Sequence, residues 1–177
     1  MRHAAALLGA VLALLTAQVL PAQERKPDAA RAEMKNAGGQ TVGQVTLEQT
    51  PQGVLIRARF TDLQPGPRAF HIHEVGKCDP PKFESAGGHF NPRSHKHGYH
   101  TPDGAHAGDL PNLHVPDTRR LTVEVLARDV SLGGDRPGGG LLVGEGTALV
   151  VHAGVDDYKT DPSGDAGGRI ACGVIRR

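Results

Sequence analysis

Histidines gather in one part of this chain, where their number and spacing suggest metal chemistry. Seven of the ten histidines in the 177 residues lie between positions 71 and 106, and Asp109 follows shortly after. Single histidines are common in solvated loops, but seven within 36 residues are hard to explain in that way. Neutral imidazole is the commonest metal ligand, and sites rich in imidazole suit copper and zinc. The segment is therefore predicted to bind metal.

One candidate ligand set lies on predicted strands. His71 and His73 belong to the short segment 70–73, which reads as a β-strand. Residues two apart point to the same face of a strand, so both imidazoles can approach one metal ion, whereas on a helix they would diverge. The apolar segment 148–151 is followed directly by His152, and a neighbouring strand could present it as a third imidazole.

A second candidate set lies in the long loop that follows. Three histidines and one aspartate, spaced 8, 9 and 3 residues apart, fit a tetrahedral zinc site; they are His89, His97, His106 and Asp109. The carboxylate also offsets the charge of the dication. His95 and His100 lie close enough to compete, and spacing alone does not exclude them. His114, in an apparent strand, is interpreted as a structural or surface residue.

The elements that position these groups are predicted to be β-strands. Glycine and proline together make up 37 of the 177 residues, which disfavours long helices. Apolar and polar residues alternate with period two, or apolar runs are bounded by turn residues, which is typical of an antiparallel sandwich or barrel. The predicted strands are 30–35, 42–47, 54–60, 70–73, 121–125, 148–151 and 170–175. The stretches 76–110, 133–140 and 153–168 are predicted loops.

The N-terminus predicts export. Residues 1–22 combine a short basic start with an apolar run, as in a secretory signal peptide. An uncleaved membrane anchor is the alternative, but the run is short of the roughly 20 apolar residues that a span needs. The chain is thus divided into a signal peptide, 1–22, and one domain, 23–177, with a mobile lead at 23–30. A periplasmic or secreted protein is expected, without membrane attachment after cleavage.

The net charge and the two cysteines limit the possible partners and cross-links of the protein. Loss of Arg2 with the signal peptide leaves 19 basic and 19 acidic residues, so no nucleic-acid partner is indicated. In an oxidising compartment the only two cysteines, Cys78 and Cys172, can form one disulfide, and two free thiols are the alternative.

Six ordered motifs carry a resemblance to a known family. They are AFHIHE at 69–74, GGHFNP at 87–92, KHG at 96–98, AHAGDL at 105–110, VVHA at 150–153 and GDAGGRIACGVI at 164–175. In these motifs the chain resembles the copper/zinc superoxide dismutases, specifically their exported bacterial branch, over about residues 30–177. The resemblance implies a flattened eight-stranded antiparallel Greek-key β-barrel, an immunoglobulin-like sandwich architecture, with two long functional loops.

The resemblance also assigns the site. It implies copper ligands at four positions, His71, His73, His89 and His152. It implies zinc ligands at His89, His97, His106 and Asp109, so that His89 bridges both metals and His97 is preferred to its neighbours. Asp156 would link the outer nitrogens of His71 and His97. Cys78 and Cys172 match the family disulfide, Arg169 matches the arginine that guides the anionic substrate, and Lys159 could assist it.

The implied function is disproportionation of superoxide to dioxygen and hydrogen peroxide, with copper alternating between Cu(II) and Cu(I). His89 is expected to exchange a proton during the cycle. A copper and zinc buffer is the main alternative, and Arg169 argues against it because a buffer needs no anion guide. A copper chaperone would need further cysteines. Both a homodimer and a monomer agree with the sequence.

Overall fold

Alternating apolar and polar residues build the long strands of the computed structural model, which describes residues 29–177. Its strands are β1 (Ala29–Asn36), β2 (Thr41–Thr50), β3 (Gly53–Phe60), β4 (Gly66–Arg68), β5 (Phe70–His73), β6 (Leu113–Val115), β7 (Leu121–Ala127), β8 (Ala148–His152) and β9 (Arg169–Val174). A short 3-10 helix, η1 (Glu84–Ala86), lies in the first long loop. None of the described residues forms a helix long and apolar enough to cross a membrane.

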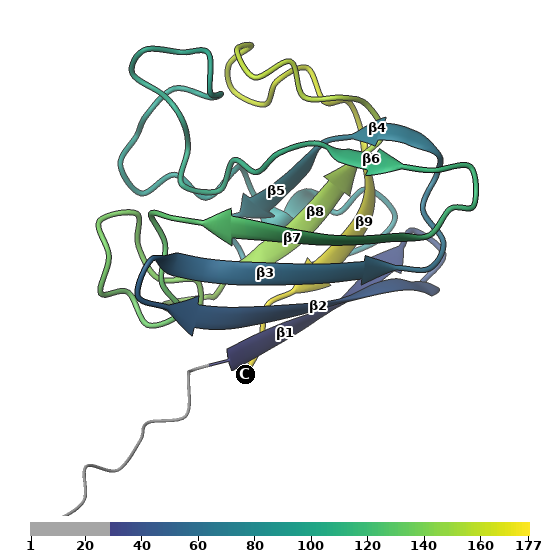
Figure 1. Ribbon diagram of the computed structural model, residues 1–177, viewed down its shortest axis with the longest axis horizontal. Helices are drawn as coiled ribbons and strands as arrows, with labels where there is room; N and C mark the ends of the chain where they lie inside the picture. The colour runs from purple at the N-terminus through teal and green to yellow at the C-terminus, as the bar shows by residue number, and fades with distance from the viewer. Residues whose placement is uncertain (1–28) are drawn as a thin grey trace, which may run out of the picture.

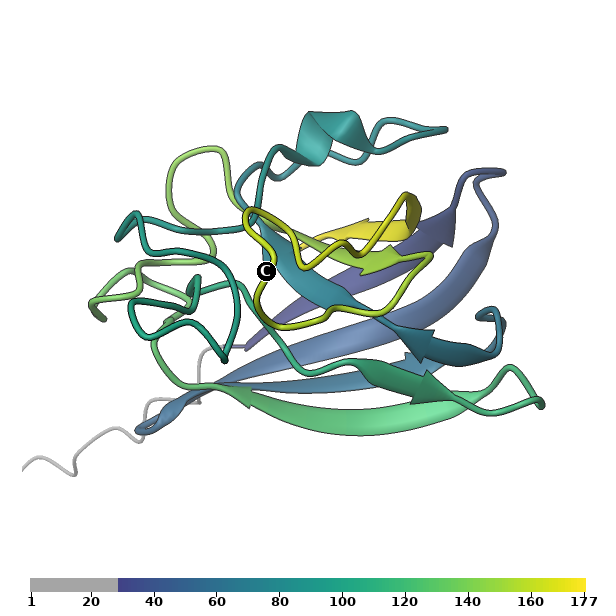
Figure 2. The ribbon, with the colours of Figure 1, turned by 90° about the horizontal axis from the view of Figure 1, so that it is seen from above.

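Every strand pairing is antiparallel, and the sheet curls into an open barrel (Figures 1 and 2). The seven-stranded sheet has the order β5-β8-β9-β1-β2-β3-β7, and β4 pairs separately with β6. Only Ala69 separates β4 from β5, so these two segments act as one interrupted strand. Counted in this way, the nine labelled strands are the eight of the expected fold. The predicted all-β architecture is confirmed.

The core follows from the period-two pattern. On β1, Ala30, Ala32 and Met34 are buried while their neighbours are exposed. On β3 the side chains of Ile56 and Phe60 are 1% exposed, and burial of each contributes about 1.5–3 kcal/mol. Residue 30 ends the segment that the sequence analysis described as a mobile lead. It is instead part of β1, because its side chain enters the core.

The predicted signal peptide, 1–22, lies outside the described residues, as does the lead up to residue 28. The loops 76–110 and 153–168 come together beside β5 and β8, as the teal and yellow segments of Figure 1 show. A hydrogen bond of 3.0 Å from the His100 amide to the Tyr158 carbonyl joins them directly. The Cys78–Cys172 disulfide ties the first loop to β9.

Candidate metal centre

The strand register explains why three histidines meet beside the barrel. Phe70 and Ile72 on β5 enter the hydrophobic core. Because side chains alternate along a strand, His71 and His73 face the other side, which the two long loops cover. β8 pairs with β5 and ends at His152, whose Nε2 lies 3.3 Å from Nε2 of His73.

The first group of buried histidines is His71, His73, His89 and His152. In each ring one nitrogen has a protein partner. His73 Nδ1 donates to the Gly87 carbonyl at 3.0 Å, and His152 Nδ1 donates to the Gly167 carbonyl at 3.2 Å. Each of these bonds leaves Nε2 with a free lone pair that points toward the other members of the group.

Two nitrogens of this group are buried without any hydrogen-bond partner among the described residues: His71 Nδ1 and His89 Nε2. Buried polar atoms in folded proteins nearly always have a partner, so an exception requires an explanation. A metal ion among the four nitrogens provides one, because it would bind both lone pairs. The residues present therefore fit an imidazole-rich copper site.

The second group supplies a different donor set. Its members are His89, His97, His106 and Asp109. Asp109 Oδ1 lies 2.9, 3.1 and 3.4 Å from the Nδ1 atoms of His89, His97 and His106, respectively. Zinc–ligand bonds of 2.0–2.1 Å in a tetrahedron give ligand–ligand edges of about 3.3 Å. Three imidazoles and one carboxylate at these separations fit zinc.

His89 belongs to both groups and presents a different nitrogen to each. Its Nδ1 lies with the second group and its Nε2 with the first. Asp156 makes a second connection. Its carboxylate lies 2.8 Å from Nε2 of His71 and 2.9 Å from Nε2 of His97. One carboxylate thus orients a ring in each group, the arrangement by which outer partners fix metal ligands.

Burial keeps three histidines of the first group, His73, His89 and His152, neutral and able to donate lone pairs. Desolvation lowers the pKa of His73 to about 2 and that of His152 to about 3, and nearby charge reinforces both shifts. Desolvation also lowers the pKa of His89 to about 4, although Asp109 acts in the opposite direction. At neutral pH these imidazoles carry no proton on the nitrogen that a metal would bind.

The carboxylates behave in the opposite way. Burial alone would favour their neutral forms, but hydrogen bonds from histidines hold the pKa values of Asp109 and Asp156 well below the usual range. Burial favours the neutral form of His97 as well and by itself would lower its pKa. The hydrogen bonds of His97 to both carboxylates nevertheless raise that pKa to about 9. The centre is therefore a buried site with two ionised acids, which suits cations.

Arg169 stands beside the first group. It lines a surface cavity together with His73, His89 and His152. Its guanidinium donates to the carbonyls of Phe83 and Gly87, both at 2.6 Å. Burial lowers the pKa of Arg169, but from a value so high that the side chain stays charged.

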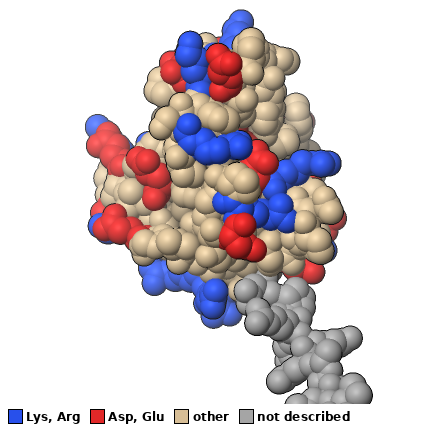
Figure 3. Space-filling view, turned by 90° about the vertical axis from the view of Figure 1, so that its left-hand side faces the viewer, with Lys and Arg blue, Asp and Glu red and all other residues tan. Residues whose placement is uncertain are grey.

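The face seen in Figure 3 carries basic and acidic side chains interspersed, without an extended area of one sign.

The remaining sequence candidates lie outside both groups. His95 lines the same cavity as Arg169, with its Nδ1 3.3 Å from the Ala105 carbonyl. His100 packs edge-on against Tyr158, and His114 is exposed on β6. Lys159 is exposed in the second loop. The structure thus brings His97, and neither His95 nor His100, to the second group.

Three further residues contact the segments that carry the two groups, and no sequence pattern indicates them: Tyr99, Asn112 and Tyr158. Tyr99 Oη donates to the Asp109 carbonyl at 2.7 Å. Asn112 contacts the backbone of Asp156. Tyr99 thus binds a backbone group within its own loop, whereas Asn112 and Tyr158 contact each other's segments across the two loops. No spacing or motif signals such contacts.

Comparisons with known proteins find similarity to one protein family over most of the chain. The family model for copper/zinc superoxide dismutase (SODC) matches residues 41–175. Cu-Zn superoxide dismutase 1 of Aquifex aeolicus is 50% identical over 156 residues, which are 88% of this chain and 90% of the relative. The Cu-Zn superoxide dismutase of Caulobacter vibrioides is 42% identical over 148 residues, which are 83% of this chain and 85% of the relative.

Solved structures of the same kind of protein are also similar to this chain. A double mutant of a superoxide dismutase-like protein from Bacillus subtilis is similar with a TM-score of 0.78 and 41% identity, covering 81% of this chain and 95% of that one. The Cu/Zn superoxide dismutase from Brucella abortus is similar with a TM-score of 0.68 and 29% identity, covering 84% of this chain and 100% of that one.

Proposed function

The chain belongs to the copper/zinc superoxide dismutase family, and we propose that its buried histidine centre is where it converts superoxide to dioxygen and hydrogen peroxide. The resemblance inferred from the motifs is confirmed. The protein is an enzyme of this family, and its cofactors are copper and zinc. Two superoxide ions and two protons yield one dioxygen and one hydrogen peroxide.

We assign copper to the first group and zinc to the second. The observation that carries this assignment is a pair of buried nitrogens, His71 Nδ1 and His89 Nε2, that have no hydrogen-bond partner among residues 29–177. They lie beside the converging Nε2 atoms of His73 and His152. The tetrahedral spacing around Asp109 Oδ1 supports zinc in the second group. When bound, copper supplies one-electron chemistry by alternating between Cu(II) and Cu(I), and zinc supplies a fixed positive charge.

His89 is proposed to hold and deliver one proton at Nε2. This nitrogen has no protein partner among the described residues, so it is free to exchange a proton with the substrate. Its Nδ1, in contrast, is held at 2.9 Å from Asp109. The ring can therefore change its protonation at one nitrogen while the other keeps its orientation.

Arg169 is proposed to bind the superoxide anion at the cavity. A guanidinium keeps its charge at every physiological pH, and here two carbonyl acceptors fix its position. Gly87 accepts from both Arg169 and His73, so the anion guide and a copper ligand share one anchor. A positive charge at a cavity raises the rate of encounter with an anion, and salt weakens this effect; superoxide dismutase is itself a standard example of such steering.

The decisive experiment measures superoxide consumption by protein loaded with copper and zinc, with metal content determined on the same sample. Activity that depends on both metals is the expected result. Full occupancy without activity would overturn the proposal and favour a metal buffer.

We further propose that the protein is exported, with residues 1–22 as a cleaved signal peptide and 23–177 as the mature domain. The basic start and apolar run of residues 1–22, the disulfide and the resemblance to the exported bacterial branch support a periplasmic or secreted enzyme without membrane attachment. Mass determination of the mature chain from a periplasmic fraction tests the cleavage, and an uncleaved chain in the membrane fraction would contradict it. Light scattering of the same sample decides between a monomer and a homodimer.

A further inference from the structure

The Asn112 carboxamide holds the backbone of Asp156 from both sides. Its Nδ2 donates to the Asp156 carbonyl at 2.9 Å, and its Oδ1 accepts from the Asp156 amide at 2.9 Å. The two residues are 44 positions apart, one after the first long loop and one in the second. A paired contact of this kind fixes both the position and the direction of the Asp156 backbone. The Asp156 carboxylate is in turn the group that orients His71 and His97.

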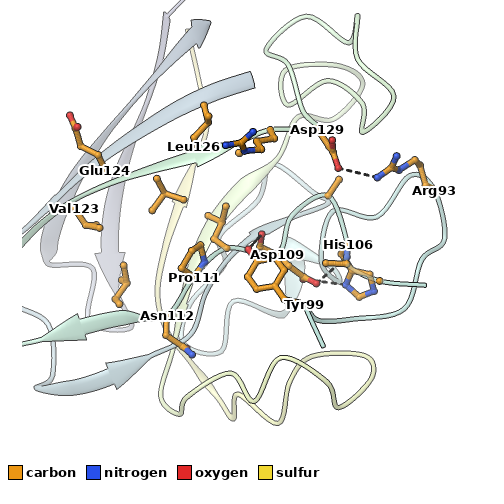
Figure 4. A pocket seen from close by; sticks show the side chains of 18 residues that line it. Arg93, Tyr99, His106, Asp109, Pro111, Asn112, Val123, Glu124, Leu126 and Asp129 are labelled. Carbon is orange, nitrogen blue, oxygen red and sulfur yellow. Dashed lines mark hydrogen bonds and ion pairs between the residues drawn. The ribbon is translucent and has the colours of Figure 1, made fainter. Parts of the chain in front are cut away.

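The only two tyrosines of the chain secure the segment that carries Asn112. Tyr99 and Tyr158 stack with ring centroids 5.3 Å apart. Tyr99 Oη donates to the Asp109 carbonyl at 2.7 Å, while Tyr158 Oη accepts from the Asn112 amide at 2.8 Å. The segment 109–112 is therefore held at both ends by the two hydroxyls. Tyr99, Asp109 and Asn112 line one cavity (Figure 4).

We propose that Asn112 is a positioning residue of the metal centre, which sets Asp156 relative to the zinc ligand Asp109, with Tyr158 as its support. The inference rests on the proposed function, because it concerns how the assigned zinc ligands are held. Asn112 lies three residues after Asp109, so any shift of this short segment moves a zinc ligand and the anchor of Asp156 together. The two loops are thereby coupled by a residue that belongs to neither group of proposed ligands.

The coupling has a physical consequence for zinc. Asp156 accepts from His97 Nε2, and this bond keeps the opposite nitrogen, Nδ1, directed at Asp109 Oδ1 at 3.1 Å. If the backbone of Asp156 is released, the carboxylate no longer fixes the ring of His97. Loss of an outer partner of a metal ligand typically weakens metal affinity by about 10–100-fold. Asn112 acts one step further out, so Asn112→Ala should weaken zinc binding by about 10-fold.

The test measures zinc affinity by competition with a chelator of known affinity, in copper-free protein, for the wild type and a set of variants. Asn112→Ala should bind zinc about 10-fold more weakly. Asp156→Ala should weaken binding at least as much, and adding Asn112→Ala to it should change nothing further, because residues that act through one another are not additive. An additive double variant, or unchanged affinity in Asn112→Ala, would overturn the inference.

Asn36→Ala is the matched control. The Asn36 side chain also binds backbone groups, accepting from the amides of Gly38 and Gln40 at 3.0 Å, but it does so in the turn between β1 and β2. Its removal should lower stability without a change in zinc affinity. Equal loss of zinc affinity in Asn36→Ala and Asn112→Ala would show that general destabilisation causes the effect, and would overturn the assignment.

A further variant keeps the question answerable if Asn112→Ala does not fold. Tyr158→Phe keeps the stacked ring and removes only the hydroxyl that accepts from the Asn112 amide. A smaller loss of zinc affinity, about 3-fold, is expected from one neutral hydrogen bond. Unchanged affinity in Tyr158→Phe would remove Tyr158 from the proposed unit.

The same experiment separates this inference from the proposed function. Failure of the wild type to bind zinc tightly would overturn the assignment of the zinc site itself. Tight binding by the wild type together with unchanged binding by Asn112→Ala would overturn only the role of Asn112.

Discussion

Removal of the Cys78–Cys172 disulfide should lower the free energy of unfolding by several kcal/mol. The bond joins residues separated by 94 positions. In the chain-entropy treatment, a cross-link over that length reduces the entropy of the unfolded chain by about 16 cal/mol/K, or about 4.7 kcal/mol at 25 °C. For a domain of this size such a loss corresponds to a decrease in Tm of roughly 10–20 °C.

The loss should also reach the site. Cys78 belongs to the loop that contains Phe83 and Gly87, whose carbonyls hold Arg169. Cys172 follows Arg169 by three residues in the chain. Without the disulfide, the loop can move relative to β9, and the guanidinium loses its fixed acceptors. We therefore expect kcat/KM to fall together with stability.

The assay is urea unfolding of metal-free protein, monitored by far-ultraviolet circular dichroism, for the wild type and a variant with both cysteines changed to alanine. The unfolding slope m should rise in the variant, because the unfolded chain is no longer compacted by the cross-link. Reduced wild-type protein is the control, since it loses the bond but keeps both side chains. A loss below about 1 kcal/mol in both samples would refute the chain-entropy reasoning.

Three further predictions concern the proposed site. His152→Ala removes a residue of the copper group that is absent from the zinc group, so activity should fall to background while zinc is retained; normal activity would refute the copper assignment. Arg169→Ala should lower kcat/KM and flatten its dependence on ionic strength, and Arg169→Lys should restore part of the rate; an unaltered salt dependence would contradict the role as anion guide. In metal-free protein His73, His89 and His152 are neutral when folded but bind protons in the unfolded chain below about pH 6.5. The free energy of unfolding should therefore decrease as the pH is lowered, by up to about 4 kcal/mol per pH unit near pH 5. Unfolding midpoints that stay constant between about pH 7 and 5 would be inconsistent with this.

Strand prediction succeeded where alternation is strict. β3 repeats apolar residues at 54, 56, 58 and 60, and the structure buries all four. β4 was not predicted because three residues, two of them glycine and proline, contain no measurable period. The helix η1 is equally short and lies inside a loop. Such elements depend on their tertiary partners, and a local pattern contains no information about them.

The candidate site, too, could be predicted from the sequence only where local geometry fixes the side chains. The pair His71 and His73 could be predicted as neighbours because strand geometry fixes the direction of residues two apart. The choice between His95 and His97 could not be made from spacing, because the loop backbone decides it. In the structure His97 Nδ1 reaches Asp109, whereas His95 Nδ1 faces the Ala105 carbonyl. Only the family resemblance indicated His97, which the structure brings to the second group.

Loop glycines then have a role that composition alone does not reveal. In the proposed copper site, His73 and His152 each need an acceptor for Nδ1, so that Nε2 is left free for the metal. The acceptors are the carbonyls of Gly87 and Gly167, which have φ values of 73° and 70°. Backbone of this left-handed kind is costly for residues with a Cβ, and at Gly87 a Cβ would also lie 2.8 Å from the Glu74 side chain. The loop glycines thus aim carbonyls at the ligand rings, and folding orients the imidazoles before a metal binds.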